Sequence, residues 1–238
     1  MSLKPVFFIV LFFVNLSFAQ TTFDYSYTNF DVIKKINNEN KGSNNFTDTN
    51  ISSLEGIIGT PYRNNSFENG TIYKNKDSVK TFLRYNGLND EIEISLSENA
   101  TSSKNSVIKS EVITCRIRNE LFIYTEFIDE KKIKTKGYLI KTYSGEKYNL
   151  YIRDKKVFKD VEKAKNSLEL DKPAKFLDKR TFFIQYMSDF PKPVKLKYKK
   201  ISELIAREDQ AKLAKLKNSY RKINSLDKLI SLISNIDK

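Results

Sequence analysis

The chain has 238 residues, of which 39% are hydrophobic and 30% charged, and it contains one Cys, no His and no Trp. The composition excludes Ser-His-Asp and Cys-His catalysis as well as an internal disulfide. The formal net charge is +13, and the 7 Gly form neither a phosphate loop nor a dinucleotide fingerprint. A zinc site would have to be built from carboxylates alone, so no metal and no cofactor is predicted.

The N-terminal segment MSLKPVFFIVLFFVNLSFAQ has the pattern of a secretory leader. One Lys precedes an apolar run from Val6 to Val14, and Ser17 and Ala19 supply the small residues before a cleavage site. The run is shorter than the roughly 20 residues that a membrane-spanning helix needs. We predict a signal peptide at residues 1–19, an exported protein and no transmembrane span after cleavage. A retained membrane anchor is the alternative.

Residues 20–55 are rich in Asn, Thr and Ser, and such a tract buries little apolar surface. It is predicted to be a flexible polar lead-in. From Gly56 onward, Gly, Pro and Asn separate short apolar pieces, which is typical of turns and edge strands.

Residues 56–199 are predicted to form an antiparallel β domain, because short runs alternate between apolar and polar residues and are joined by brief polar connections. The runs are VKTFLRYN (79–86), EIEISL (91–96), SVIKSEVITCRIR (106–118), LFIYTEF (121–127), KGYLIKTYS (136–144) and KYNLYIR (147–153). The expected fold class is α+β, mainly β. It is an antiparallel meander, either an open sheet or a partial barrel, with one face buried and one solvated and a C-terminal helical appendage.

The stretch FLRYNGLNDEIEI (82–94) is predicted to be a hairpin with Asn-Gly and Asn-Asp at its turn. Leu83 and Tyr85 then face the core, while Arg84 and Asn86 lie on the solvent face. A ligand-binding loop is the alternative, because turns on rigid sheets often carry binding residues. The candidate ligand-binding residues at this position are therefore Arg84, Tyr85 and Asn86.

Three further segments of the β domain have less regular patterns. Cys115 shares one strand face with Ile113 and Ile117, and we expect it to be a buried hydrophobic residue. Residues 155–180 are polar and are predicted to form a crossover with one short helix. Residues 181–187 and 194–199 then form a last hairpin around DFPKP.

Residues 200–238 have helical periodicity and are predicted to be a helical tail packed on the β domain. Asp209 is the expected cap of one helix, and Ser225 or Asn224 that of the last helix. The last helix carries an apolar stripe that must be buried. Its members are Leu226, Leu229, Ile230, Ile233 and Ile236. Packing on its own sheet is the first interpretation, and a partner's groove or an oligomer is the second.

The positive charge is concentrated toward the C-terminus. Residues 172–238 hold 17 Lys or Arg against 7 Asp or Glu, whereas residues 20–171 hold 24 against 22. Such an excess is either a solvated face or a surface for a polyanion, namely an anionic envelope surface or a nucleic acid. Because an exported protein meets little nucleic acid, no nucleic-acid partner is predicted.

From about residue 54 to residue 236, the order of these segments resembles a group of exported proteins of Bacteroidetes bacteria that has no assigned activity. The residues that carry the resemblance are Phe67 and Gly70, Arg84-Tyr85-Asn86, Lys199-Lys200 before Leu204, and the Lys-Ile-Asn at 222–224 before the last helix. The resemblance implies a location in the periplasm or at the outer-membrane periphery, or outside the cell. In such bacteria O-glycosylation occurs at Asp followed by Ser or Thr and a small apolar residue, and Asp77-Ser78-Val79 makes Ser78 a candidate glycosylation site.

The sequence thus favours a non-enzymatic, envelope-associated binding or structural protein. Its expected partner is another envelope protein or an anionic cell-surface glycan. The alternative is a receptor for a carbohydrate or small ligand, in which exposed rings on the sheet stack against the ligand. The rings considered for this role are Tyr85, Tyr124 and Tyr151.

Overall fold

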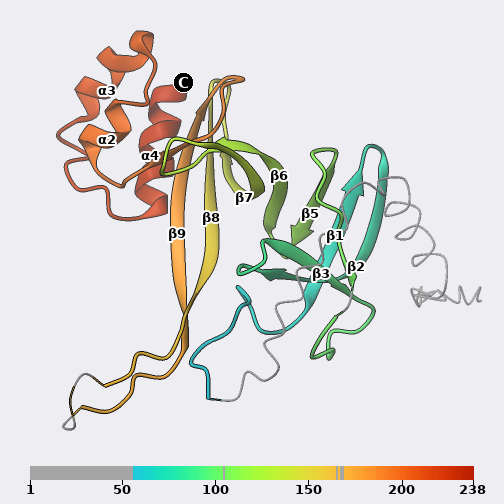
Figure 1. Ribbon diagram of the computed structural model, residues 1–238. Coiled ribbons are helices and arrows are strands. Elements are labelled where there is room, and N and C mark those ends of the chain that lie inside the picture. Colours follow the sequence, from blue (N-terminus) through green and yellow to red (C-terminus); the bar gives the residue numbers. More distant parts are fainter. Residues whose placement is uncertain (1–55, 104, 165, 167–168) are drawn as a thin grey trace, which may run out of the picture.

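The computed structural model describes residues 56–103, 105–164, 166 and 169–238 (Figure 1). The predicted signal peptide at residues 1–19 and the lead-in at residues 20–55 lie outside this part of the chain.

The described residues form one antiparallel sheet of ten strands in the order β10-β9-β8-β7-β6-β5-β1-β2-β3-β4. The strands are β1 (Glu68–Lys74), β2 (Asp77–Asn86), β3 (Glu91–Ser95), β4 (Asn105–Ser106), β5 (Ile113–Ile117), β6 (Glu120–Ile128), β7 (Lys134–Ser144), β8 (Tyr148–Lys159), β9 (Lys175–Tyr186) and β10 (Lys192–Val194). The sheet is curled into a half-barrel, with short helices near the C-terminal end (Figure 1). The predicted α+β, mainly β fold is confirmed.

The sheet consists of two meanders joined at its centre. Strands β1–β4 form the first meander, strands β5–β10 form the second, and β5 pairs with β1. The run at 106–118 was expected to be one strand, but it divides into β4 and β5. The Ile113 N–H donates to the Ser110 carbonyl at 3.1 Å, and this turn takes the chain from the sheet edge back to β1.

The hairpin predicted at residues 82–94 is confirmed, with Tyr85 opposite Ile92 across β2 and β3. Its turn also joins distant parts of the half-barrel, because the Gly87 carbonyl accepts from the Lys156 N–H at 3.0 Å. The inner side of the half-barrel is the first apolar core. Its buried members include Ile72, Leu83, Tyr85, Ile92, Cys115, Phe122, Tyr138 and Ile152. The predicted burial of Cys115 is confirmed, and burial raises the pKa of its thiol.

The opposite face of β6–β9 is buried as well, which corrects the expectation of one solvated face. Phe127, Leu139, Tyr151 and Phe183 form a second core on that face. The sheet bends over this core, and the Ile128 N–H of β6 donates to the Pro191 carbonyl just before β10 at 2.9 Å. Strands enclosed in this way carry apolar residues on both sides, which the alternation pattern alone underestimates.

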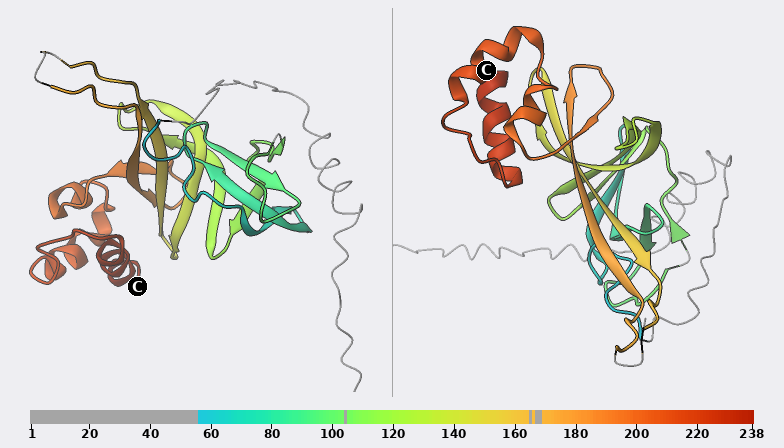
Figure 2. Two further views of the ribbon diagram at one scale, coloured as in Figure 1. Left: turned by 90° about the horizontal axis from the view of Figure 1, so that it is seen from below. Right: turned by 60° about the vertical axis from the view of Figure 1, so that its left-hand side comes forward.

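The expectation of a crossover with a helix at residues 155–180 is wrong. β8 and β9 pair continuously from Tyr148↔Tyr186 to Lys159↔Lys175, and beyond them Glu162 pairs with Lys172. The result is a two-stranded arm that projects beyond the rest of the sheet (Figures 1 and 2). The many lysines and other polar residues of the arm hide the strand periodicity from a hydrophobicity pattern.

The helices follow β10 directly. They are α2 (Tyr198–Ser202), the 3₁₀ helix η1 (Arg207–Asp209), α3 (Gln210–Leu216) and α4 (Leu226–Asp237). The last predicted hairpin has a shorter second strand than expected, because the chain leaves the sheet after Val194 and enters α2 at Tyr198. The Ser225 hydroxyl accepts from the Lys228 N–H at 3.3 Å, so the predicted cap of α4 is confirmed.

The apolar sides of the helices pack on the end of β8, β9 and β10 farthest from the arm (Figures 1 and 2). From the sheet, Tyr148, Leu150 and Ile184 enter this third core. From α4, the buried residues are Leu229, Leu232, Ile233 and Ile236. The apolar stripe of the last helix is therefore buried on the protein's own sheet.

Candidate functional site

A buried carboxylate attaches the end of α4 to the turn between β7 and β8. Asp237 Oδ1 accepts from the Lys147 N–H at 2.8 Å and from the Tyr148 N–H at 3.3 Å. Its Oδ2 accepts from the Tyr143 hydroxyl at 3.0 Å. Because a buried carboxylate is stable only when donors surround it, these contacts fix the helix end on the sheet.

A second buried carboxylate, Asp209, supports the same turn from the start of α3. It receives the Lys147 ammonium at 3.1 Å and the Tyr148 hydroxyl at 3.0 Å. The Tyr148 hydroxyl in turn accepts from the Ala206 N–H at 3.0 Å, and burial raises the pKa of Tyr148. Asp209 stands at the N-cap position of α3, as expected, but it makes no capping bond because its oxygens are used by the sheet.

Exposed cations gather around the connection between α3 and α4. In the described structure their side chains make no contact with a carboxylate within ion-pair distance, and the one polar contact among them is from the Lys228 ammonium to the Lys222 carbonyl at 3.5 Å. We call this surface the basic face. It consists of Lys215, Lys217, Arg221, Lys222 and Lys228.

The basic face results from how the helical segment distributes its charges. Asp209 and Asp237 are 1% and 5% exposed, so two of its acidic side chains are turned inward and neutralised by the sheet. Lys212 caps the end of α4 by donating to the carbonyls of Ile236 and Lys238 at 3.2 and 3.0 Å. The remaining lysines and arginine point outward, and the surface keeps a net positive potential.

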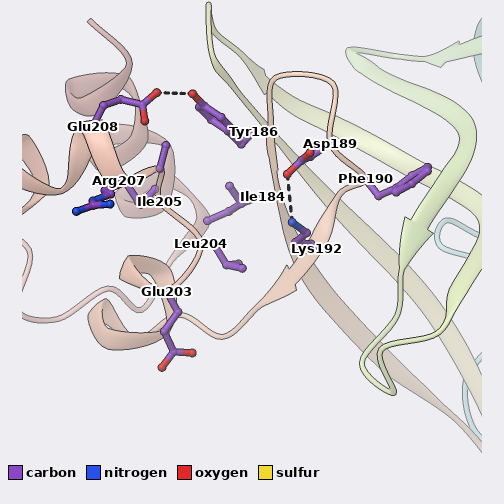
Figure 3. A pocket seen from close by; sticks show the side chains of 11 residues that line it. Ile184, Tyr186, Asp189, Phe190, Lys192, Glu203, Leu204, Ile205, Arg207 and Glu208 are labelled. Carbon is purple, nitrogen blue, oxygen red and sulfur yellow. Dashed lines mark hydrogen bonds and ion pairs between the residues drawn. The ribbon is translucent and has the colours of Figure 1, made fainter.

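A groove of about 320 Å³ lies between the β9–β10 hairpin and the segment that contains α2 and η1 (Figure 3). Ile184, Leu204 and Ile205 are its apolar lining residues, and Phe190 stands on the side of the hairpin. The volume is at the lower end of the range for small-molecule sites.

Each acidic side chain that lines this groove has a partner. The Tyr186 hydroxyl donates to Glu208, which raises the pKa of Tyr186 to about 12 and lowers the pKa of Glu208. Asp189 receives the Lys192 ammonium at 3.2 Å, as Figure 3 shows. Glu203 receives Lys200 at 2.9 Å. The groove therefore has an apolar floor and a charge-balanced rim.

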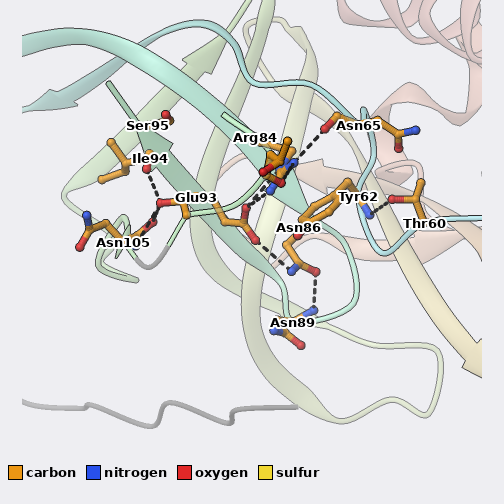
Figure 4. Close-up of polar contacts among 12 residues, drawn as sticks. Thr60, Tyr62, Asn65, Arg84, Asn86, Asn89, Glu93, Ile94, Ser95 and Asn105 are labelled. Carbon is orange, nitrogen blue, oxygen red and sulfur yellow. Dashed lines mark hydrogen bonds and ion pairs between the residues drawn. The ribbon is translucent and has the colours of Figure 1, made fainter. Parts of the chain in front are cut away.

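Arg84, predicted on the solvent face of the hairpin, is buried with an exposed fraction of 3% (Figure 4). Its guanidinium donates to Glu93 Oε2 at 2.7 and 3.1 Å, and to the Asn65 carbonyl at 2.8 Å. The rings of Tyr62 and Phe67 lie 3.6 and 4.2 Å from its Cζ atom. Residues preceding β1 thus cover this side of the hairpin, a coverage that strand alternation does not reveal.

Asn86 and Tyr85 are also engaged inside the protein. Asn86 donates to Glu93 Oε1 at 3.2 Å, and its side-chain oxygen accepts from the N–H groups of Leu88 and Asn89 at 3.1 Å, which fixes the turn. Tyr85 donates to Asp90 Oδ1 at 2.6 Å. The structure brings the three candidates Arg84, Tyr85 and Asn86 together, and their polar groups are used to hold the hairpin.

Of the other candidate residues, Tyr151 is 4% exposed, and its hydroxyl donates to Gln185 at 2.5 Å. Tyr124 is half-buried, with its ring edge-on to Tyr138 at 5.3 Å. Tyr85 and Tyr151 therefore offer no stacking platform on the surface. Ser78 is exposed at the start of β2, where a modifying enzyme can reach it.

Sequence reasoning missed the two carboxylates that fix the helices, as well as the arm. Asp209 has the local pattern of a cap and Asp237 that of a solvated helix end, and neither pattern indicates a contact with a turn about 60 or 90 positions earlier in the chain. The unequal spread of charge was the one available signal for the basic face. Within the described residues, no group of three or more Asp, Glu, Cys or His side chains could hold a metal ion.

None of the helices in the described part of the chain has the length and apolar character that a membrane crossing requires. Comparisons of the chain with models of known families, with curated proteins and with solved structures find no match.

Proposed function

We propose that this protein is a non-enzymatic binding protein of the bacterial envelope, and that its basic face binds an anionic cell-surface glycan. The observation that carries the proposal is the cluster of exposed cations without carboxylate partners around the α3–α4 connection. The predicted signal peptide and the resemblance to exported Bacteroidetes proteins support a location in the periplasm or at the outer-membrane periphery.

The packing of the helices leaves their positively charged side chains available to bind a partner. The apolar stripe of α4 is buried in the protein's own core. The helix surface that remains for a partner is therefore cationic and not apolar. Four of the five cations are lysines, which are mobile point charges with no fixed geometry of recognition. Such a surface suits a repeating polymer of carboxylates, sulfates or phosphates, which can meet several ammonium groups at once.

The groove beside β10 supports binding in preference to catalysis. Ammonium groups pair with Asp189 and Glu203, the Tyr186 hydroxyl donates to Glu208, and the pKa of Glu208 is lowered and not raised toward neutrality. A general acid would require the opposite shift.

The test measures binding of an acidic polysaccharide, polygalacturonate, by calorimetry at low and high salt, with neutral dextran as the reference polymer. The basic-face variant replaces four cations by Gln at Lys215, Lys217, Arg221 and Lys222. A matched variant removes four exposed lysines elsewhere, at Lys76, Lys131, Lys132 and Lys195. Both variants lose the same net charge.

We expect the basic-face variant to lose at least about tenfold in affinity, and the matched variant to stay within about threefold of the unmodified protein. Binding should also weaken as salt is raised. Equal losses in the two variants would show that only net charge matters and would refute a site at the basic face. Absence of binding to polygalacturonate and to a sulfated glycan such as heparin would refute the proposed function.

A further inference from the structure

The β8–β9 arm has two faces with different charge arrangements. On one face, the register places Lys155 opposite Lys179, Val157 opposite Leu177, and Lys159 opposite Lys175. Two pairs of like charges thus enclose one apolar pair, and directly opposed like charges destabilise a sheet. We call this surface the lysine face.

The other face of the same arm is compensated. Arg180 lies opposite Asp154 and donates to it at 2.6 and 2.7 Å, while Lys156 lies opposite Asp178 and pairs with it at 2.6 Å. On this face of the arm, each of these two cross-strand pairs therefore joins opposite charges. The contrast indicates that the lysine face is a specific arrangement and not a consequence of overall lysine content.

Acidic neighbours neutralise the lysine face only at its margins. Lys159 pairs with Glu162 at 2.8 Å, and Lys179 pairs with Glu130 at 3.1 Å. Lys155 and Lys175 have no carboxylate within ion-pair distance in the described structure. Burial and the adjacent Arg153 lower the pKa of Lys155. The face would therefore be stabilised by an external anion.

The arm also exposes an unusual amount of apolar surface. Val157 and Leu177, at the centre of the lysine face, are 42% and 41% exposed. Farther along the arm, Val161 is 49% exposed and Leu170 is 90% exposed. Val157 and Leu177 form an exposed apolar pair flanked by cations on a projecting element, which is typical of an interaction surface.

We propose that the lysine face of the arm docks on the surface of an anionic lipid bilayer. The exposed apolar side chains enter the boundary between headgroups and acyl chains. The aliphatic parts of the lysine side chains extend toward the headgroup layer, so that the ammonium groups reach the lipid phosphates. A soluble acidic glycan or peptide would satisfy the ammonium groups but would leave Val157 and Leu177 in water. The combination of both features favours a lipid surface.

The inference is independent of glycan binding by the basic face. The arm and the helices lie at opposite ends of β8 and β9 (Figures 1 and 2). The arm can therefore bind a bilayer while the basic face, at the other end of β8 and β9, binds a glycan.

The experiment measures cosedimentation of the processed chain, after removal of the leader, with two kinds of vesicle. One is pure phosphatidylcholine, and the other contains about one third phosphatidylglycerol. The variants are K159Q/K175Q for charge and V157S/L177S for apolar contact, with the basic-face variant of the preceding section as the control for charge removed elsewhere.

We expect binding to the anionic vesicles only. K159Q/K175Q should weaken it by roughly fivefold per lysine, V157S/L177S should weaken it by about tenfold, and the basic-face variant should change it less than twofold. Because the chain contains no Trp, a Trp introduced at Leu177 is a unique reporter of the environment of the arm. The fluorescence of L177W should shift to the blue on addition of anionic vesicles, whereas that of L96W, at an exposed position in the bend after β3, should not.

The L177W reporter keeps the proposal testable if V157S/L177S fails to fold. Three results would overturn the inference: no binding to anionic vesicles, a stronger loss in the basic-face variant than in the arm variants, or a fluorescence shift of L177W with polyglutamate but not with vesicles. Failure of glycan binding would leave these measurements unaffected.

Discussion

Asp237 at the end of α4 and Lys147 in the turn between β7 and β8 are joined by a hydrogen bond of 2.8 Å from the Lys147 N–H to the Asp237 carboxylate. Ninety positions of sequence separate the two residues. The same Lys147 reaches Asp209 with its side chain at 3.1 Å, so one turn residue contacts both the start of α3 and the end of α4. These polar contacts act together with the apolar core between the helices and the sheet to fix the position of the basic face.

Replacement of Asp237 by Ala should lower the free energy of unfolding by about 3 kcal/mol, because it leaves the half-buried Lys147 N–H and the buried Tyr148 N–H without an acceptor. Urea unfolding followed by circular dichroism measures the loss. Asp227→Asn, on the exposed first turn of the same helix, is the control and should cost less than about 1 kcal/mol. Similar losses in the two variants would mean that the buried contacts contribute little.

Gly145 should not tolerate a side chain, because a Cβ atom built there overlaps the Asp237 carboxylate. Gly145→Ala is expected to cost about 1–3 kcal/mol in the unmodified protein. In an Asp237→Ala background the same change should cost less than in the unmodified protein, because the carboxylate is gone and only the Tyr143 hydroxyl, at 2.7 Å, remains close to the added Cβ. A double-mutant cycle in urea measures the difference, and simple additivity of the two changes would contradict the proposed contact.

Arg84→Met should destabilise the protein by about 3–5 kcal/mol, because Glu93 would remain as a buried charge without its partner. Adding Glu93→Gln should recover part of the loss, since the uncompensated charge is then removed. Lys136→Gln breaks the exposed ion pair with Glu111 and should cost less than about 1 kcal/mol. Thermal and urea unfolding of the three variants gives the comparison. A double variant no more stable than Arg84→Met would refute the charge argument.

Stability should fall in alkaline solution. Burial raises the pKa of Tyr85, Tyr138, Tyr148 and Tyr151 above the ordinary value of 10.0, in Tyr151 to about 12. A group whose folded-state pKa is raised contributes stability that is complete below its unfolded pKa and is lost as pH rises through the folded value. The loss is therefore expected between pH 10 and 12.

Absorbance of ionised Tyr at 295 nm, recorded together with circular dichroism, measures this transition. Because the chain has no His, no ordinary side-chain pKa lies between 5 and 8, and stability should change little from about pH 6 to 9. Tyr ionisation that is complete by pH 10.5 in the folded protein would contradict the burial of these hydroxyls.

Where local pattern and burial agree, the sequence was sufficient to predict the structure. Alternation placed Leu83, Tyr85 and Cys115 in the core correctly, and the Ser225 cap and the apolar stripe of α4 were also readable. Both signals arise from residues close together in the chain, where the periods of strands and helices apply directly.

The pattern failed where a distant segment decides the environment of a side chain. Arg84 looks solvated in its strand, but residues 62–67 cover it. Asp237 looks like an exposed helix end, but Lys147 and Tyr143 surround it. The arm was mistaken for a crossover because its lysine pairs lack the apolar alternation by which strands are recognised. Tertiary contacts, and not local preference, determine each of these cases.

The pairing of β1 with β5, which joins the two meanders, has a consequence for how the protein folds. β2 follows β1 directly in the chain, whereas the other neighbour of β1 begins about 40 positions later, at Ile113. In that interval one side of β1 is an unpaired sheet edge on which another chain can add. The topology therefore requires β5 to reach that edge quickly during folding, and slowed synthesis of residues 75–117 should favour aggregation over folding.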